Sequence, residues 1–320
     1  MATFCLALIA TCELLTRFLP PTDPDIAAQG RYFAERKKDI DTIFIGSSRI
    51  RFQVDPRQFD VETKGHGAPT HSLNLAYQGM WPPETYYYLR QLLATRPRRL
   101  RWVVIEVIDY RFGQVEYLGI TKRMVVWHDW KHTAMVFRRI MESPQPAGEK
   151  CLWLSKHAQC FLQRSVDPGR GADWLRQRYF PSKGKSEVTA MKRGGYDPKP
   201  KVDWDEATQA QYALELREFE QSPPQRVRPG LASALREVIE EVRRAGAEPI
   251  LVIPPSTRVE EKLTEGLPKG VTIWAFNNPA EFPRLYDPEL LYDLGHLNEN
   301  GSREFTSLLA KRMAELAQKP

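Results

Sequence analysis

Residues 41–49 read Asp-Thr-Ile-Phe-Ile-Gly-Ser-Ser-Arg, and this stretch decides the fold of the 320-residue chain. A short apolar, β-branched run stopped by glycine is typical of a strand buried on both faces of a parallel sheet. Similar runs recur at 72–76, 101–107, 248–254 and 271–276, and helix-length segments accompany them at 23–38, 82–95, 230–245 and 300–318. Because strands separated by helices form right-handed βαβ crossovers, we expect an α/β fold with a doubly wound parallel sheet of about five strands.

One long segment, 111–228, interrupts this alternation. It is far longer than a crossover helix requires, and it holds 21 Lys and Arg against 14 Asp and Glu. Five of the eight tryptophans fall within it, at positions 127, 130, 153, 174 and 204. We interpret 111–228 as a basic, Trp-rich insertion that caps the site, and we assign 23–110 with 229–320 to the α/β core.

The composition limits the class of protein. Hydrophobic residues make up 42% of the chain, which is enough for a sizeable core and excludes a disordered or fibrous protein. The net charge of +6 comes without a basic arm, so nucleic acid is not an expected partner. Four cysteines without a C-x2-C pair exclude a disulfide-framework miniprotein. Cys151 and Cys160 could bridge outside the cytoplasm or could remain buried thiols.

The N-terminal segment 1–22 is apolar but short for a membrane span. Its uncharged part covers only residues 2–12, and Glu13 and Arg17 follow before a Pro-Pro pair. A signal-anchor, a cleaved signal and an ordinary buried helix are the three alternatives. We favour the anchor, which would hold the remaining chain on the extracytoplasmic or periplasmic face of a membrane.

The first candidate for chemistry is Gly46-Ser47-Ser48, because ligands of open parallel sheets bind beyond the carboxyl ends of the strands. Glycine permits a tight turn there, and the following serine can present its hydroxyl at the sheet edge. Small residues after a strand also commonly cap the next helix. The chain has no G-x-G-x-x-G or phosphate-binding P-loop, and Ile50 breaks the G-x-S-x-G pattern, so no cofactor is expected.

The second candidate is Asp293-Leu294-Gly295-His296, just before the last helical segment. An Asp three residues ahead of a His can hold one imidazole nitrogen and leave the other free as a general base. Taken alone, the same pattern also fits a turn cap beside a surface histidine.

Taken together, these two motifs resemble the SGNH (GDSL-type) hydrolase family. Gly46-Ser47-Ser48 matches its Gly-Asp-Ser block with Ser47 in place of Asp, which implies that Ser48 is the nucleophile. Asp293 and His296 match its last block and complete a Ser-His-Asp triad. The resemblance implies a flavodoxin-like core.

The family's two middle blocks match less well. Residues 74–79, Asn-Leu-Ala-Tyr-Gln-Gly, resemble its second block, and the resemblance implies Gly79 and Asn74 as oxyanion or substrate-binding residues. The third block, Gly-x-Asn-Asp, is missing, because the third strand ends instead with Glu106 and Asp109 nearby. Both acids should face the site region, and we assign neither a role.

The function that the resemblance implies is acyl transfer through a covalent serine ester. Water as the acceptor would make the enzyme an esterase, and a sugar hydroxyl would make it an O-acyltransferase. The closest members are membrane-tethered proteins that acylate envelope polysaccharides or teichoic acids. The expected partners are an acylated carbohydrate or small molecule and a membrane acyltransferase that supplies acyl groups. Two alternatives remain open: a catalytically inactive glycan-binding module, and a basic protein that binds nucleic acid or anionic lipid.

Other histidines carry weaker signals. His128 and His132 are four residues apart and could share a helix face, but the Glu and third ligand of a zincin are missing, so no metal site is predicted. His66 and His71 precede the second block and could line the pocket.

Overall fold

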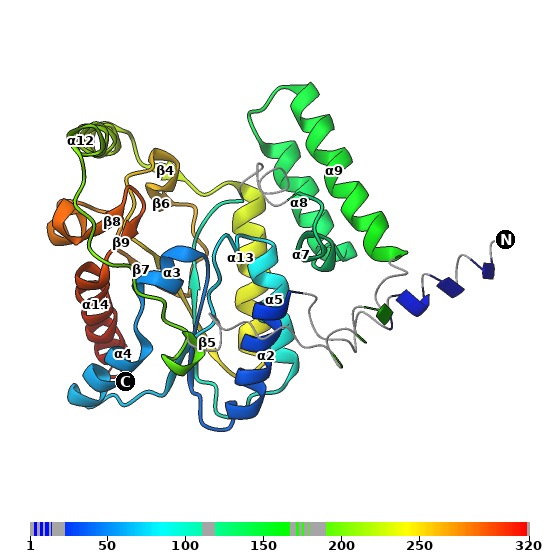
Figure 1. The fold of residues 1–320 in the computed structure, drawn as a ribbon, viewed down its shortest axis with the longest axis horizontal. Helices are drawn as coiled ribbons and strands as arrows, with labels where there is room; N and C mark the ends of the chain where they lie inside the picture. Colours follow the sequence, from blue (N-terminus) through cyan, green and yellow to red (C-terminus); the bar gives the residue numbers. More distant parts are fainter. Residues whose placement is uncertain are drawn as a thin grey trace.

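The computed structural model describes residues 23–110, 119–166 and 190–318, with isolated positions among 3–14 and 171–179. At its centre lies a parallel sheet of five strands in the order β2-β1-β3-β5-β7 (Figure 1). The strands are β1 (Thr42–Ile45), β2 (Ser72–Asn74), β3 (Trp102–Glu106), β5 (Glu248–Ile253) and β7 (Thr272–Ala275). All five lie within the predicted apolar runs, which confirms the α/β class and the parallel sheet. Numbered among themselves, the strands follow the order 2-1-3-4-5, one of the common orders of doubly wound sheets.

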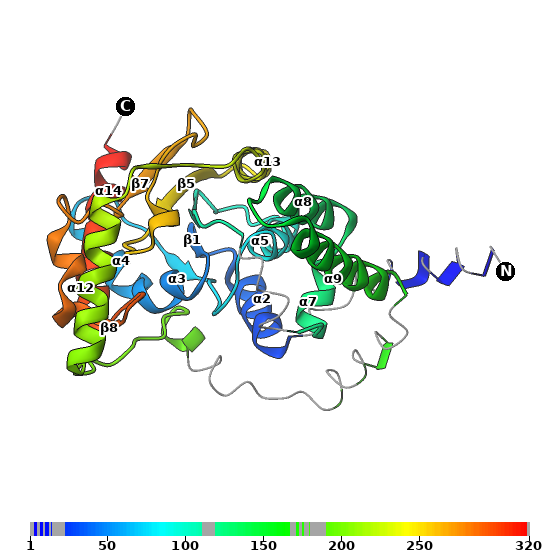
Figure 2. The same cartoon turned by 90° about the horizontal axis from the view of Figure 1, so that it is seen from above.

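Helices cover both faces of this sheet. On one face lie α2 (Pro24–Arg36), α5 (Glu84–Ala94) and α13 (Pro229–Arg244); on the other lie α3 (Ser48–Gln53), α4 (Pro56–Gly65) and α14 (Glu299–Ala317) (Figure 2). Side chains alternate along β1, so Ile43 and Ile45 join the core under the first set while Phe44 joins the core under the second. This alternation explains why the strands read as continuous apolar runs.

Local capping explains where α2 begins. The Asp23 carboxylate accepts hydrogen bonds from the backbone N–H groups of Asp25 and Ile26, and Pro24 occupies the first helical position. An acidic N-cap residue and a proline at the first helical position both favour the start of a helix.

The long segment 111–228 divides into two parts that pack on different sides of the core. The helices α7 (Lys122–Val126), α8 (Trp130–Glu142) and α9 (Ala147–Ser165) share a buried core with residues of α2 and α5, and α8 also packs on α13. In contrast, α12 (Glu206–Gln221) lies on the side of the molecule that carries α14 (Figure 2). Residues 111–118 and most of 167–189, including Trp174, lie outside the described residues.

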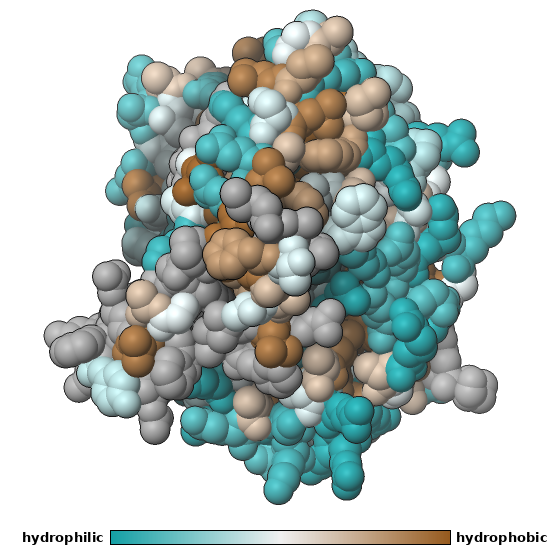
Figure 3. All heavy atoms as spheres, turned by 90° about the vertical axis from the view of Figure 1, so that its right-hand side faces the viewer, coloured by the Kyte–Doolittle hydropathy of each residue, from teal (hydrophilic) through white to brown (hydrophobic). Residues whose placement is uncertain are grey.

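The outer face of the α7–α9 unit is partly apolar. Exposed side chains on it include Trp130, Leu152 and Leu162. Figure 3 faces this side of the molecule and shows apolar side chains among polar ones at its surface.

The expected membrane anchor at 1–22 lies mostly outside the described residues. Within the part of the chain that the structure does describe, none of the helices combines the length and the apolar character that a bilayer span requires.

Cys151 and Cys160 do not form the disulfide that was one alternative. Both lie on α9 and both are free thiols, with Cys151 exposed and Cys160 buried. Nine residues of helix separate their Cα atoms by roughly 13 Å, about twice the reach of a disulfide.

Candidate active site

Ser48 is the first residue of α3, directly beyond the carboxyl end of β1. Ser47 caps this helix by accepting a hydrogen bond from the backbone N–H of Arg49. Gly46 makes the turn possible, because a Cβ at this position would lie 2.5 Å from Glu106 Oε2 and 2.6 Å from Glu106 Cβ. A glycine is therefore required by the close approach of β3.

Asp293 and His296 lie on a hairpin that the sequence did not predict. The strands β8 (Leu291–Asp293) and β9 (His296–Leu297) pair antiparallel, and Asp293 is opposite His296 in their register. The backbone N–H of Gly295 donates to Asp293 Oδ1 at 2.8 Å, which fixes the turn between them.

Asn298 anchors this hairpin to the closing helix. Its buried side-chain amide donates to the carbonyls of Glu289 and Leu291. Its Oδ1 accepts from the N–H groups of Asn300 and Gly301 and so caps α14. The hydrogen bonds of Asn298 thus help to fix the position of His296, which lies two residues before it.

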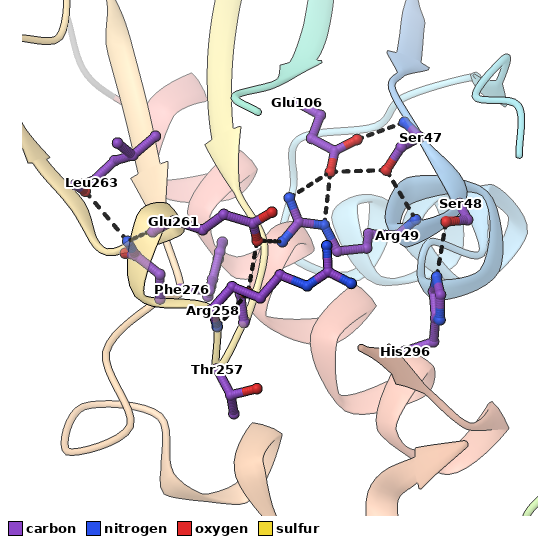
Figure 4. Close-up of polar contacts among 12 residues, drawn as sticks. Ser47, Ser48, Arg49, Glu106, Thr257, Arg258, Glu261, Leu263, Phe276 and His296 are labelled. Carbon is purple, nitrogen blue, oxygen red and sulfur yellow. Dashed lines mark hydrogen bonds and ion pairs between the residues drawn. The ribbon is translucent and has the colours of Figure 1, made fainter. Parts of the chain in front are cut away.

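The two motifs converge at one edge of the sheet (Figure 4). Ser48 Oγ lies 2.8 Å from His296 Nε2, a contact drawn in the figure. His296 Nδ1 lies 2.8 and 2.9 Å from the two carboxylate oxygens of Asp293. The three residues that the sequence singled out are therefore brought together, although 248 residues separate Ser48 from His296.

The electrostatics favour one tautomer of the imidazole. Partial burial would raise the pKa of the Asp293 carboxyl, but the hydrogen bond and charge of His296 and the N–H of Gly295 outweigh it and hold that pKa below its usual value. An ionised Asp293 accepts a hydrogen bond from a protonated Nδ1. Nε2 then carries no proton and can accept the hydrogen bond of the Ser48 hydroxyl.

A buried charge cluster that the sequence did not reveal lies beneath the serine turn. Arg49 donates to Glu106 Oε1 at 2.9 Å and forms a second ion pair with Glu261, and all three side chains are buried. Glu106 also accepts hydrogen bonds from the backbone N–H and the hydroxyl of Ser47. Burial lowers the pKa of Arg49, but the adjacent charges of Glu261 and Glu106 outweigh it and raise that pKa.

This cluster shows what Glu106 does at the end of β3. Its carboxylate ties the serine turn to the neighbouring strand, so it acts on the geometry of residues 46–49 (Figure 4). Asp109, the other acid near this strand end, instead pairs with Arg139 of α8 at 2.6 Å. The sequence did hold one signal for the Arg49–Glu106 ion pair: an arginine directly follows Ser48, and a glutamate ends a strand that is predicted to be buried.

The two expected oxyanion residues differ in their surroundings. Gly79 has a left-handed backbone with φ of +65°, in a turn closed by the hydrogen bond from Met80 N to Tyr77 O. The turn begins beside the serine loop, because Tyr77 N donates to Gly46 O at 3.1 Å.

Asn74 is fully buried, and its side chain is committed to the backbone. Its amide nitrogen donates to the carbonyls of Ile50 and Val54 at 2.8 and 3.0 Å, and its Oδ1 accepts from Ala76 N. Both amide protons are used, so Asn74 has none left for a substrate. It fastens α3 to the loop after β2 instead of serving as the expected substrate contact.

A narrow, mostly apolar hollow, partly open to solvent, lies beside His296. One wall is the segment 255–257 after β5, and another is 295–297, which includes His296 itself. Tyr212 of α12 also lines it, so part of the long insertion does border the site.

Lys199, from the same insertion, lies near the other side of the histidine. Its Nζ is 3.8 Å from the centre of the Phe52 ring, and that ring lies 5.5 Å from the His296 ring. The α7–α9 unit, by comparison, packs on the opposite face of the sheet.

The other histidines do not join this site. His71 precedes β2 and bonds to Asp39 O, at the amino end of the sheet, and His66 ends α4. His128 bonds to Met124 O and to His157, while His132 pairs with Asp129. Among the described residues, no group of three or more His, Cys, Asp or Glu is arranged to hold a metal ion.

Comparison with known proteins adds no relative. No protein-family model matches the sequence, and none of the curated proteins is significantly similar to it.

Proposed function

We propose that this chain is a serine-dependent ester hydrolase or O-acyltransferase of the SGNH type that acts on cell-envelope carbohydrate. The observation that carries the proposal is the hydrogen-bonded line from Ser48 Oγ through His296 to Asp293. Nucleophile, base and orienting acid in this order are the arrangement that activates a serine hydroxyl.

In the first half of the reaction, Ser48 Oγ attacks the carbonyl carbon of the ester while His296 Nε2 takes the hydroxyl proton. The tetrahedral intermediate then collapses, the C–O bond to the alcohol breaks, and His296 returns the proton to the departing oxygen. Asp293 stabilises the imidazolium that exists between these two transfers and holds the ring in place.

In the second half, an acceptor hydroxyl gives its proton to His296 and attacks the carbonyl carbon of the acyl-serine. The bond from this carbon to Ser48 Oγ then breaks, and His296 returns the proton to Oγ. Water as the acceptor completes hydrolysis, and a sugar hydroxyl completes transfer. The N–H of Ser48 belongs to the first turn of α3, where a helix leaves N–H groups without internal acceptors, and it is one proposed donor to the oxyanion. The N–H of Gly79 is the second.

The choice of an envelope carbohydrate follows from the resemblance of 46–48, 74–79 and 293–296 to membrane-tethered SGNH proteins. The basic balance and tryptophan content of 111–228 support it, because aromatic rings stack on sugar faces and arginine pairs with carboxylate or phosphate groups. A membrane acyltransferase would then supply the acyl groups.

Covalent labelling tests the serine chemistry directly. The purified chain is incubated with a fluorophosphonate probe, which traps activated serines, and the labelled residue is located by peptide mass spectrometry. We expect labelling of Ser48 in wild type and its loss in Ser48→Ala, with Ser155→Ala on the exposed face of α9 as the matched control.

Equal labelling of wild type and Ser48→Ala would contradict the proposal and would favour the inactive glycan-binding module. Labelling that persists in Ser155→Ala and disappears in both Ser48→Ala and His296→Ala would support it.

A further inference from the structure

We propose that Arg258 binds an anionic group, a carboxylate or a phosphate, of the substrate whose ester reacts at Ser48. This inference rests on the proposed serine chemistry and adds the substrate's charge to it. It starts from the loop 254–258 after β5, which lies at the same edge of the sheet as the serine turn.

The base of this loop is held firmly. Ser256 and Thr257 are both buried, and Ser256 Oγ donates to Glu261 at 2.6 Å while it accepts from the backbone N–H of Arg258 at 3.1 Å. The Tyr286 hydroxyl accepts from Ser256 N. The backbone of Arg258 is therefore fixed relative to the charge cluster beneath Ser48.

The side chain of Arg258 is exposed at the surface. Within the described part of the chain, the Arg258 guanidinium makes neither an ion pair nor a hydrogen bond. Figure 4 shows the side chain reaching from the Thr257 loop toward the side of the cluster where Ser48 and His296 lie.

The surrounding charges explain why an anion is the expected ligand. The nearby Arg49 already pairs with two buried carboxylates, and Lys199 and Arg51 both lie 3.8 Å from the Asp197 carboxylate. Arg258 is thus the cation of this group that has no carboxylate partner among the described residues. Its planar fork suits two oxygens of one carboxylate or phosphate.

The hollow beside His296 shows how close the Arg258 loop lies to the candidate triad. The loop residues 255–257 form one wall and 295–297 form another, so the loop that carries Arg258 borders the same narrow space as His296. An anionic group next to the reacting ester would therefore lie on the side of the site from which Arg258 extends.

Ester hydrolysis with matched probes tests the inference. The probes are 4-nitrophenyl butyrate, which is neutral, 4-nitrophenyl hemisuccinate, which carries a carboxylate, and the 4-nitrophenyl ester of phosphonoacetate. At low ionic strength we expect wild type to prefer one anionic probe over the neutral one by about tenfold in kcat/KM, the size of one charge-assisted hydrogen bond. The anionic probe that is preferred identifies the group.

The variant Arg258→Gln should lose this preference through a higher KM, with its rate on the neutral probe unchanged within twofold. Arg258→Lys should keep part of it. The matched control is Arg99→Gln, an exposed arginine before β3 at the opposite end of the sheet, which should behave as wild type. An equal loss on charged and neutral probes, or no loss at all, would overturn the inference.

A binding measurement separates this inference from the serine chemistry. We expect 20 mM succinate or inorganic phosphate to raise the Tm of wild type and Arg99→Gln, but not that of Arg258→Gln. If no variant hydrolyses esters or reacts with fluorophosphonate, the proposed function fails, while an Arg258-dependent rise in Tm still supports an anion site. The absence of that rise in wild type would contradict the site itself.

Discussion

The absence of a side chain at Gly46 sets how closely β3 can approach the serine turn. The Glu106 carboxylate occupies the space that a Cβ would need, and it bonds to Ser47 from there. The position of Ser48 therefore depends on the close packing of Gly46, which follows β1, against Glu106, which ends β3.

The replacement of Gly46 should destabilise the fold. We expect Gly46→Ala to lower the free energy of unfolding by about 1–3 kcal/mol, because the added methyl group would overlap Glu106 in a closely packed region. Urea denaturation at pH 7.5 measures the change.

The control for this variant is Gly65→Ala at the end of α4, where an added Cβ would meet no atom within 4 Å. It should be neutral or slightly stabilising, because alanine favours a helix over glycine. Equal effects of the two substitutions would show that the contact with Glu106 is not what requires a glycine.

The residues of the candidate triad could be found from the sequence because each sits in a short local pattern. Ser48 follows a strand and glycine, and Asp293 lies three residues before His296. The partners of Arg49 could not be found in this way. Glu261 lies 212 residues later in a 3-10 turn, η1 (Val259–Glu261), and nothing local distinguishes it from a solvated acid.

At the scale of elements, the strands were predictable and the inserted helices were not. The central strands β1, β3 and β5 are mostly apolar and are buried on both faces, so their residues identify them whatever lies around them. The α7–α9 unit instead buries polar residues among its apolar ones, including His128 between α7 and α8, and His157 and Arg164 on α9. The sequence alone does not show that these polar side chains are buried, because their hydrogen-bond partners lie on other segments of the chain.

A chain of hydrogen bonds accounts for two of these buried histidines. His128 Nδ1 donates to Met124 O, His157 Nδ1 donates to His128 Nε2, and the Tyr110 hydroxyl donates to His157 Nε2 at 2.6 Å. Every nitrogen is used once, and the direction of the chain requires both rings to be neutral. The protonation of either ring would turn the Tyr110 hydroxyl from donor to acceptor, and its own proton would lose the histidine as its acceptor.

This chain should make the structure sensitive to acid. Burial lowers the pKa of His128 to about 3, although the hydrogen bond to Met124 O and the charge of Asp129 oppose this shift, and burial lowers the pKa of His157 as well. A depressed histidine pKa contributes stability above its unfolded value near 6.5, and this stability is lost as the pH falls below it. Between pH 7.5 and 5 we expect His128 alone to account for a loss of roughly 2 kcal/mol.

Urea denaturation at both pH values measures this loss. The triple variant Tyr110→Phe, His128→Phe, His157→Phe removes the whole chain and should show a smaller acid destabilisation. His66→Gln, which changes an exposed histidine at the end of α4, should keep the full response. An undiminished acid response in the triple variant would mean that other groups are responsible.

At the scale of the whole molecule, the sheet brings together segments that are far apart in the sequence. The serine turn follows β1, Glu106 ends β3, Glu261 follows β5, and the His296 hairpin precedes the last helix. A parallel sheet collects all these strand ends at one edge, which is why the location of the site could be predicted from the fold class alone. Arg49, in the serine turn, links three of these segments, because it forms ion pairs with Glu106 and with Glu261.

The removal of that charge should therefore affect the fold as a whole. In Arg49→Met the carboxylates of Glu106 and Glu261 would remain buried without their shared counter-charge, and we expect a loss of about 3–5 kcal/mol in the free energy of unfolding at pH 7.5. Arg284→Met, which changes an arginine with a 62% exposed side chain, is the control and should lose less than about 1 kcal/mol.

The pH dependence of this loss identifies its cause. Burial without a partner raises the pKa of a carboxyl above the unfolded value near 4.3, so the folded variant takes up protons before the unfolded chain does. The difference between Arg49→Met and wild type should then shrink as the pH falls from 7.5 to 5, when both proteins are unfolded in urea at each pH. A difference that stays constant would point to lost packing of the arginine side chain, because packing does not titrate, and would contradict a role for its charge in joining the three segments.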